Sequence, residues 1–275
     1  MPELPEVETI VRELSDEISG EIISSVKIFR RNPIVQGNIE KFKRDLSGKE
    51  FIHVSRRAKY LIFHLKPKCF LISHLRMTGK FIVSNSLSSP TKHNRVWFIF
   101  RSGRILIFDD IRCFGTLEIQ KKLINSKTLK KLGIEPLSEE MNPEFFLKKL
   151  SNSRREIKSV MLDQSIIAGL GNIYASEILF KSGIHPQSEV CNFKKKDWGN
   201  IIKFTKIILQ EAIEKNGTTI SDFRRVDEKT GEFQKFLKVY GKNNLPCPKC
   251  SVPIQRIVQQ QRSTFFCNEC QKIKK

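Results

Sequence analysis

The chain has 275 residues, of which 39% are hydrophobic and 28% charged, a balance typical of a soluble globular protein and too apolar for general disorder. Its 49 Lys and Arg against 29 Asp and Glu give a formal net charge of +20, so we expect a polyanionic partner, nucleic acid before an acidic membrane surface. Runs of about 18 apolar residues and a signal peptide are both absent, so we expect a cytoplasmic protein without membrane contact.

The first predicted element is a helix over residues 6–19, which follows Pro5 at its start. Its apolar residues recur at the spacing of one helical face: Val7, Ile10, Val11, Leu14 and Ile18. We therefore expect the apolar face of this helix to be buried and to fix the position of the N-terminus.

From about 21 to 119 the pattern changes to short runs rich in β-branched and aromatic residues. In chain order they are IISSVKIF, EFIHVS, YLIFHL, CFLISHL, KFIVS, VWFIF, RILIFDD and TLEIQ. Glycines punctuate the series at Gly48, Gly79, Gly103 and Gly115. Such a series predicts an antiparallel β-sandwich or barrel.

After about residue 120 the signals become helical. Asn142 and Pro143 suit a helix cap and a first helical position, and FFLKKL follows them. Further helices are expected at roughly 155–163, 172–182 and 195–216. Residues 217–240 are polar and basic, and we interpret them as a long functional loop. The predicted fold class is α+β and multidomain, in three parts: 1–120, 121–240 and 241–275.

Two Cys-x-x-Cys pairs close the chain. Cys247 and Cys250 precede Cys267 and Cys270 by a spacing that lets four thiolates surround Zn²⁺. The alternative is two reactive dithiols, but the βαβ setting of a thioredoxin-type motif is absent. Four thiolates leave no open coordination position, so we expect one structural zinc ion. The segment between the pairs predicts a β-hairpin with Arg262 near its tip, where it either faces phosphate or is solvated.

The chain begins Met-Pro-Glu, and because methionine is normally removed before a small residue, we expect Pro2 to become the terminus. Its secondary amine has a larger basic population near neutral pH than a lysine, since α-amino groups titrate near ~8 and lysines near ~10.4. Attack on a sugar C1′ yields an iminium that expels the base and acidifies the C2′ proton. Glu3 lies beside this amine as a candidate proton shuttle, whereas Glu6 is more typical of the acidic first turn of a helix.

Four separated motifs carry a family resemblance: MPELPEVET at the start, RRAKYL at 56–61, GLGNIYASEIL at 169–179 and QRSTFFCNECQ at 261–271. With these motifs in order, the chain resembles the formamidopyrimidine-DNA glycosylases over nearly its whole length. The resemblance implies a catalytic β-sandwich domain over 1–120, a helical domain with a helix-two-turn-helix and a lesion-recognition loop over 121–240, and a zinc finger over 241–275.

The implied activity is that of a bifunctional DNA glycosylase and AP lyase in base excision repair. Such an enzyme removes oxidised purines, among them 8-oxoguanine and formamidopyrimidines, from double-stranded DNA, here expected as a monomer associated with the nucleoid. By the resemblance, Pro2 is the Schiff-base nucleophile and Glu3 the acid. Lys59 matches the lysine assigned to β-elimination and phosphate contact, and Arg262 matches the arginine assigned to δ-elimination. From the residues alone, Lys59 is simply a lysine before a strand.

The resemblance also implies that the target base leaves the duplex and that wedge side chains fill its place. Met77 in HLRMTG, with Arg112 and Phe114 in DDIRCFG, match the intercalating trio, although the apolar pattern alone favours core positions for Met77 and Phe114. The chain departs from the usual Asp-Pro-Arg-Arg-Phe-Gly, with Ile111 for proline and Cys113 for the second arginine. We therefore expect a less rigid loop with one positive contact fewer.

Further residues match DNA-contacting positions of the family: His93, Lys158, Asn172 and Tyr240. Asn172 opens a helix directly after Gly-Leu-Gly, where free backbone N–H groups favour a phosphate. His93 taken alone is more typical of an ordinary surface histidine.

Two alternatives remain open at this point. An endonuclease VIII-like glycosylase shares the fold and the proline but prefers oxidised pyrimidines, and Leu4 together with the Met77, Arg112 and Phe114 set favours the purine enzyme. A non-catalytic zinc-ribbon DNA-binding protein would keep the charge and the cysteines but would need no particular N-terminus.

Overall fold

The computed structural model describes residues 1–29, 34–86, 89–218 and 231–274. The chain divides into two compact units. The first contains residues 1–130 and 215–232, and the second contains 131–214 and 233–275. The zinc-binding C-terminus therefore packs with the helices, while residues 215–218 and 231–232 pack with the N-terminal unit.

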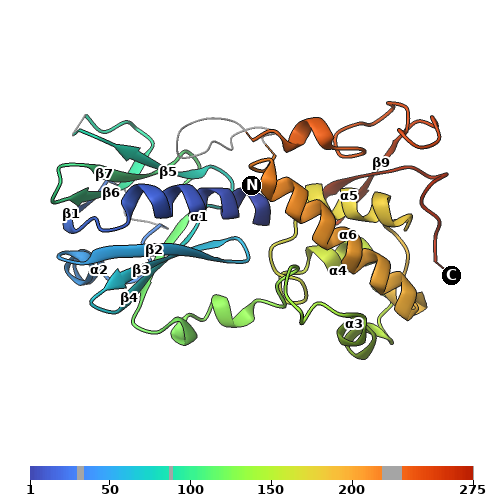
Figure 1. Ribbon diagram of the computed structural model, residues 1–275, viewed down its shortest axis with the longest axis horizontal. Coiled ribbons are helices and arrows are strands. Elements are labelled where there is room, and N and C mark those ends of the chain that lie inside the picture. The colour runs from blue at the N-terminus through green and yellow to red at the C-terminus, as the bar shows by residue number, and fades with distance from the viewer. Residues whose placement is uncertain (30–33, 87–88, 219–230, 275) are drawn as a thin grey trace. The chain divides into compact units, whose positions relative to one another are not determined.

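The first unit consists of helix α1 (Leu4–Ile18) and two four-stranded antiparallel sheets (Figure 1). One sheet has the order β1-β6-β7-β5, with bounds Ile23–Ile28, Asn94–Phe100, Ile105–Asp110 and Gly79–Ser84. The other has the order β2-β3-β4-β8, with bounds Glu50–Arg57, Tyr60–Lys66, Cys69–His74 and Thr116–Gln120. The predicted β-sandwich is confirmed, and each predicted run forms one of these strands.

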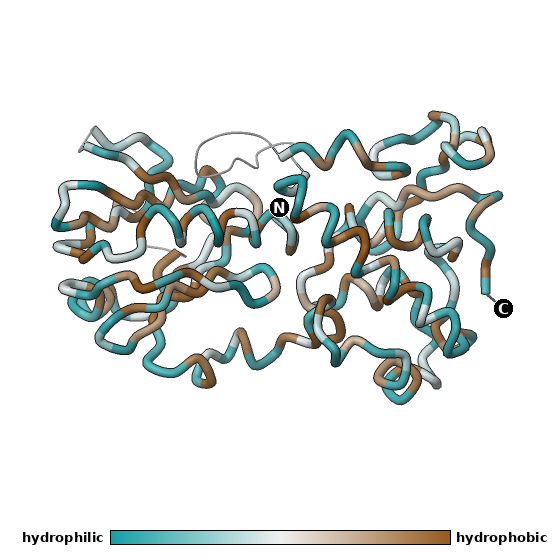
Figure 2. Tube along the Cα trace, in the orientation of Figure 1, coloured by the Kyte–Doolittle hydropathy of each residue, from teal (hydrophilic) through white to brown (hydrophobic). Residues whose placement is uncertain are grey.

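A single hydrophobic core joins α1 to both sheets. Hydrophobic residues recur along α1 at helical spacing (brown in Figure 2), and Val7, Ile10 and Leu14 enter this core. Edge-on aromatic contacts continue it: the ring centroids of Phe51 and Phe63 lie 5.6 Å apart, and those of Phe63 and Phe81 lie 5.2 Å apart. Each buried ring contributes roughly 1.5–3 kcal/mol of transfer free energy. The core thus fixes the start of α1, and with it the N-terminus, on the sandwich.

Helix α2 (Ile39–Leu46) lies in the part of the chain where only strands were expected. It begins where the Asn38 side chain accepts a hydrogen bond from the Lys41 N–H at 2.8 Å, and it buries Phe42 and Leu46. The prediction missed this helix because its apolar residues cover only two turns. Its Asn cap and acidic first turn were the available signals.

The second unit holds four α-helices and a two-stranded hairpin among its described residues: α3 (Pro143–Leu150), α4 (Ile157–Leu162), α5 (Asn172–Ser182), α6 (Lys195–Glu214), β9 (Gln255–Gln259) and β10 (Arg262–Phe266). The Asn142 side chain caps α3 by accepting the Phe145 N–H at 2.9 Å, as expected from the Asn-Pro start. Phe146 of α3 stacks on Trp198 of α6 at 4.4 Å, and α5 ends at Gly183, whose φ is +70°. The predicted helical part and C-terminal hairpin are confirmed.

The predicted loop over 217–240 is only partly described. Thr218 and Glu232, which lie on either side of residues 219–230, form an isolated antiparallel bridge, and a short 3-10 helix follows at Phe233–Phe236. Residues 219–230, which include most of the FRRVDEKTGEF sequence, lie outside the described residues. Among the helices that the structure describes, none is long and apolar enough to cross a membrane.

Candidate active site

The N-terminal residues of the first unit are held by the first turn of α1. Pro2 is buried, and Glu3, which caps the helix, is 4% exposed. The Glu3 carboxylate accepts the Glu6 N–H, while the Glu6 Oε2 accepts the Glu3 N–H at 2.7 Å, a reciprocal capping box. These bonds fix the backbone that directly follows Pro2, and they hold the Glu3 carboxylate in a buried position at the start of α1.

Glu6 also binds Thr218, the residue that directly precedes 219–230. Its Oε1 accepts the Thr218 N–H at 2.8 Å, and a Cβ added to Gly217, whose φ is +75°, would lie 2.8 Å from the same oxygen. Only a glycine suits that backbone and that approach. Sequence reasoning treated Glu6 as a helix-dipole residue. It missed this contact because the partner is 212 residues away and no local pattern signals it.

Lys59 lies in the tight turn between β2 and β3 and is only 4% exposed, which is unusual for a lysine. Arg56 holds this turn by donating from Nε to Glu8 Oε2 at 2.9 Å and from its guanidinium to the Ala58 carbonyl at 3.1 Å. Ala58 has a φ of +53°. The turn is therefore tied to α1, the helix that also carries Pro2 and Glu3.

A buried histidine lies near Lys59. His74 is 5% exposed, and its Nδ1 accepts the Arg76 N–H at 2.9 Å. Burial, together with the positive charges of Arg76 and Lys59, lowers the pKa of His74 to about 3. The ring is therefore neutral at physiological pH and acts as a hydrogen-bond acceptor for the turn that follows β4.

The proposed intercalating residues lie on two turns of the sandwich unit, and their side chains are exposed. Met77 is 40% exposed and Phe114 is 50% exposed, which excludes the alternative of core positions. The Arg112 guanidinium carbon lies 4.8 Å from the centre of the Phe114 ring. Ile111 is 54% exposed. His93 is half-buried on the same unit.

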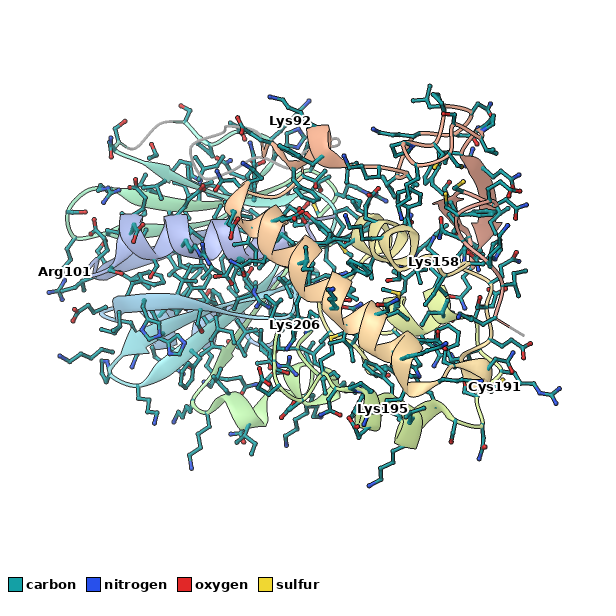
Figure 3. All side chains as sticks on the ribbon, turned by 45° about the vertical axis from the view of Figure 1, so that its right-hand side comes forward. Lys92, Arg101, Lys158, Cys191, Lys195 and Lys206 are labelled. Atoms are coloured by element: carbon teal, nitrogen blue, oxygen red, sulfur yellow. The ribbon has the colours of Figure 1, made fainter. Side chains whose placement is uncertain are left out.

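In the second unit, two predicted DNA-contacting residues converge on the hairpin. Lys158, labelled in Figure 3, is 1% exposed. Its amine donates to the Ser263 carbonyl at 3.1 Å and to the Thr264 hydroxyl at 2.5 Å. The Asn172 amide donates to the same Ser263 carbonyl at 2.8 Å. Both side chains therefore hold the residue next to Arg262, and their assignment as phosphate contacts stays a prediction.

Arg262 is exposed and opens strand β10 directly after a two-residue turn. The turn residues Gln260 and Gln261 have φ values of +47° and +61°, which is the type I′ geometry of a tight hairpin. The Gln259 amide donates to Glu156 at 2.7 Å, and the Gln260 amide donates to Ser159 at 2.7 Å. These contacts hold the hairpin tip against helix α4, so Arg262 projects from a braced backbone.

Glu177 was not singled out in the sequence, although it lies inside the GLGNIYASEIL motif. It is 4% exposed, and its carboxylate accepts the N–H groups of Lys238, Val239 and Tyr240 at 2.8, 2.9 and 2.8 Å. Burial raises the pKa of Glu177, while the three donated hydrogen bonds act in the opposite direction. Glu177 thus sets the backbone position of Tyr240.

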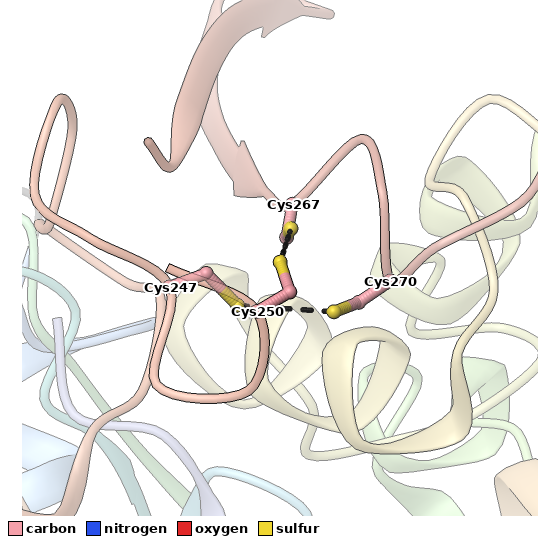
Figure 4. Close-up of side chains that lie close together, drawn as sticks. All are labelled: Cys247, Cys250, Cys267 and Cys270. Carbon is pink, nitrogen blue, oxygen red and sulfur yellow. Dashed lines mark hydrogen bonds between the residues drawn. The ribbon is translucent and has the colours of Figure 1, made fainter. Parts of the chain in front are cut away.

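The four C-terminal cysteines form one cluster (Figure 4). All four sulfur atoms lie within 4.8 Å of one another, with Cys247 and Cys270 at 3.8 Å and Cys250 and Cys267 at 3.4 Å. A tetrahedron with Zn–S bonds of about 2.3 Å has edges of about 3.8 Å, so the spacing fits zinc. These residues hold one structural zinc ion, and the closed thiolate set assigns it to folding rather than to catalysis.

Three family models match successive segments of the chain. They are the formamidopyrimidine-DNA glycosylase N-terminal domain over residues 1–117, the formamidopyrimidine-DNA glycosylase H2TH domain over 132–224, and the zinc finger found in FPG and IleRS over 244–273. The helix-two-turn-helix domain expected in the helical part is therefore confirmed.

Curated relatives match along the whole chain. The formamidopyrimidine-DNA glycosylase of Carboxydothermus hydrogenoformans is 40% identical over 273 residues, covering 99% of this chain and 100% of that protein. The enzyme of the same name from Desulforamulus reducens is 38% identical over 277 residues, covering all of both chains. A solved structure of Lactococcus lactis Fpg with N7-benzyl-Fapy-dG containing DNA superposes with a TM-score of 0.91 at 37% identity, covering 98% of this chain and 100% of that one.

The β-sandwich, the H2TH helices and the zinc finger, in this order, define a zinc-containing DNA glycosylase. The chain belongs to the formamidopyrimidine-DNA glycosylase family.

Proposed function

We propose that this enzyme excises oxidised purines from double-stranded DNA by attack of the Pro2 amine on C1′ of the damaged nucleotide, and then cleaves the strand by β- and δ-elimination. The observation that carries the proposal is the N-terminus, where Pro2 precedes a buried Glu3 that is fixed by the capping box with Glu6. A non-catalytic DNA-binding protein would not need a proline followed by a buried glutamate at its N-terminus. The DNA of a Lactococcus lactis neighbour contains Fapy-dG, and that of another contains an abasic site, which supports both steps.

Removal of Met1 supplies the secondary amine that the first step uses. The lone pair of the Pro2 nitrogen forms a bond to C1′, the bond from C1′ to the base breaks, and the base leaves with its electron pair. Glu3 gives a proton to the sugar O4′ as the ring opens, and the departing base takes up the proton that the Pro2 nitrogen releases, so that an iminium joins this nitrogen to C1′. The positive nitrogen withdraws electrons from C2′ and makes its proton acidic.

Strand cleavage follows from the same covalent intermediate. Loss of the C2′ proton expels the 3′-phosphate, which is β-elimination, and a second proton loss expels the 5′-phosphate, which is δ-elimination. Lys59 serves the first elimination and contacts phosphate, and Arg262 serves the second. The burial of Lys59 and the brace behind Arg262 support these roles, because both place a cation at a defined position.

Binding rests on phosphate contacts and on filling the space of the flipped base. Met77, Arg112 and Phe114 enter the duplex, and their exposure on two neighbouring turns supports this role. The phosphate-contacting set comprises His93, Lys158, Asn172 and Tyr240. The enzyme acts as a monomer on chromosomal DNA in the cytoplasm, associated with the nucleoid.

The test uses duplexes that carry 8-oxoguanine, a formamidopyrimidine or an oxidised pyrimidine, with borohydride present to reduce the iminium. The pyrimidine is included because the DNA of one Lactococcus lactis neighbour contains an oxidised pyrimidine. We expect excision and a trapped complex, with the purine lesions processed faster. Faster processing of the pyrimidine would favour an endonuclease VIII-like enzyme, and the absence of any trapped complex would contradict the Schiff-base mechanism.

A further inference from the structure

The two turns that carry the exposed wedge residues are joined by side-chain hydrogen bonds. Met77 lies on the turn between β4 and β5, and Phe114 lies on the turn between β7 and β8. Asp110 ends β7 and has no exposed surface. Its Oδ1 accepts the Thr78 hydroxyl at 2.5 Å, and its Oδ2 accepts the Gly115 N–H at 2.8 Å. One buried carboxylate therefore binds the residue after Met77 and the residue after Phe114.

The Thr78 hydroxyl closes this network. It donates to Asp110 and accepts the Arg112 N–H at 2.9 Å, while the same N–H reaches Asp110 Oδ1 at 3.2 Å. Each group in the set has the partner that its chemistry requires, since the carboxylate accepts, the N–H groups donate and the hydroxyl does both. Hydrogen bonds to a carboxylate are the stronger kind, so removal of the hydroxyl is costly.

The backbone of both turns needs such support. Arg76 and Cys113 have φ values of +54° and +58°, a left-handed conformation that costs a residue with a side chain roughly 1–2 kcal/mol. The space at Gly115 is closed as well, because an added Cβ would lie 2.6 Å from the Phe108 ring and 3.1 Å from Asp110 Oδ2. Both turns therefore pack against the Asp110 carboxylate.

The hydrogen bonds to Asp110 also constrain the backbone around position 111, where this chain has isoleucine and not proline. Proline fixes its own φ near −65°, whereas Ile111 leaves that angle free. Because the isoleucine side chain is 54% exposed, it is not anchored in the core either. The hydrogen bonds from Arg112 and Gly115 to Asp110 therefore define the loop geometry that a ring would otherwise constrain.

We propose that Thr78 is a positioning residue that couples the two turns through Asp110, so that Met77 and Phe114 enter the duplex as one unit. This inference rests on the proposed function. The proposed mechanism assigns no catalytic step to Thr78. The hydrogen bonds of its hydroxyl couple the position of Met77 to that of Phe114, and an experiment can measure this coupling.

The test measures single-turnover excision of 8-oxoguanine from two duplexes, one with the lesion base-paired and one with it opposite a gap, where part of the unstacking cost is already absent. Thr78→Val is expected to slow excision from the paired duplex on the order of tenfold, since one charge-assisted hydrogen bond is lost. The loss on the gapped duplex should be clearly smaller. Thr78→Ser keeps the hydroxyl and should restore the paired rate.

A double-mutant cycle between Met77→Ala and Phe114→Ala gives the readout that a merely structural role would not change. With Thr78 present, the two substitutions should be non-additive on the paired duplex, and in the Thr78→Val background they should become additive. If Thr78→Val does not fold, Thr78→Ala replaces it in the same cycle.

Equal losses on both duplexes, or a cycle that Thr78 does not alter, would overturn the inference while leaving the proposed function intact. If the unsubstituted enzyme failed to excise the lesion from either duplex, the proposed function itself would fail.

Discussion

The buried His74 makes the stability of the sandwich unit depend on pH. The pKa of His74 is lowered from 6.5 to about 3 in the folded state, so the unfolded chain binds the proton first as the pH falls. A histidine whose pKa is lower in the folded chain than in the unfolded chain stabilises the folded state at pH values above its unfolded pKa. This stabilisation decreases as the pH falls from about 6.5 towards about 3. Between pH 7.5 and pH 5 the loss from this one group is about 2 kcal/mol.

Urea unfolding followed by tryptophan fluorescence tests this value. The chain has two tryptophans, Trp97 in the sandwich unit and Trp198 in the second unit, so a Trp198→Phe background leaves Trp97 to report on the sandwich. With a slope of about 2 kcal/mol per molar urea, the midpoint should fall by about 1 M from His74 alone. Asparagine offers an oxygen to the Arg76 N–H but does not titrate, so His74→Asn should show a pH dependence that is smaller by this amount.

His74→Asn is compared with the unsubstituted chain in the same Trp198→Phe background, so that the two proteins differ only at position 74. If His74→Asn lost as much stability between pH 7.5 and pH 5 as the unsubstituted chain, the neutral, buried state assigned to His74 would be wrong.

The remaining predictions concern metal and DNA. Chelation of zinc, or Cys250→Ser, should weaken DNA binding before the sandwich unfolds, because the hairpin that carries Arg262 depends on the metal; full activity with well under one zinc per chain would contradict this. Affinity for undamaged duplex should fall with salt at a slope of about −4.5 for roughly five phosphate contacts, and Lys59→Ala should flatten the slope by about one unit in a salt titration. Phe114→Ala should leave the slope unchanged while slowing excision of a paired lesion, since the ring acts on unstacking and carries no charge; a slope change equal to that of Lys59→Ala would refute the wedge role.

Local patterns predicted most of the fold. The eight runs between residues 21 and 119 form strands because β-branched and aromatic residues alternate there between turn residues, and the cysteine spacing predicted the zinc site. Helix α2 was missed because two turns are too short to show a clear helical period. The segment 217–240 was expected to be one loop, but its first residues bind Glu6 and its last three residues donate their N–H groups to Glu177.

The candidate residues themselves came from motifs, but the groups that hold them did not. Asp110 and Thr78 lie 32 residues apart, Lys158 and Ser263 lie 105 apart, and no periodicity connects either pair. Contacts of this kind arise from how strands and helices pack, which a single sequence does not display. The structure therefore adds the supports of the site: the Glu6 bond to Thr218, the carboxylate between the two wedge turns, and the two donors to the Ser263 carbonyl.

The proposed nucleophile is the Pro2 amine, and mass spectrometry of the reduced covalent complex can identify the nitrogen that attacks C1′. The enzyme is incubated with 8-oxoguanine duplex and borohydride, the reduced complex is digested, and mass spectrometry locates the sugar adduct on the peptides. We expect an adduct on the nitrogen of Pro2 in a chain that has lost Met1, and no adduct in a form that retains Met1. An adduct on Lys59, or normal excision by chains shown by mass to begin at Met1, would contradict it.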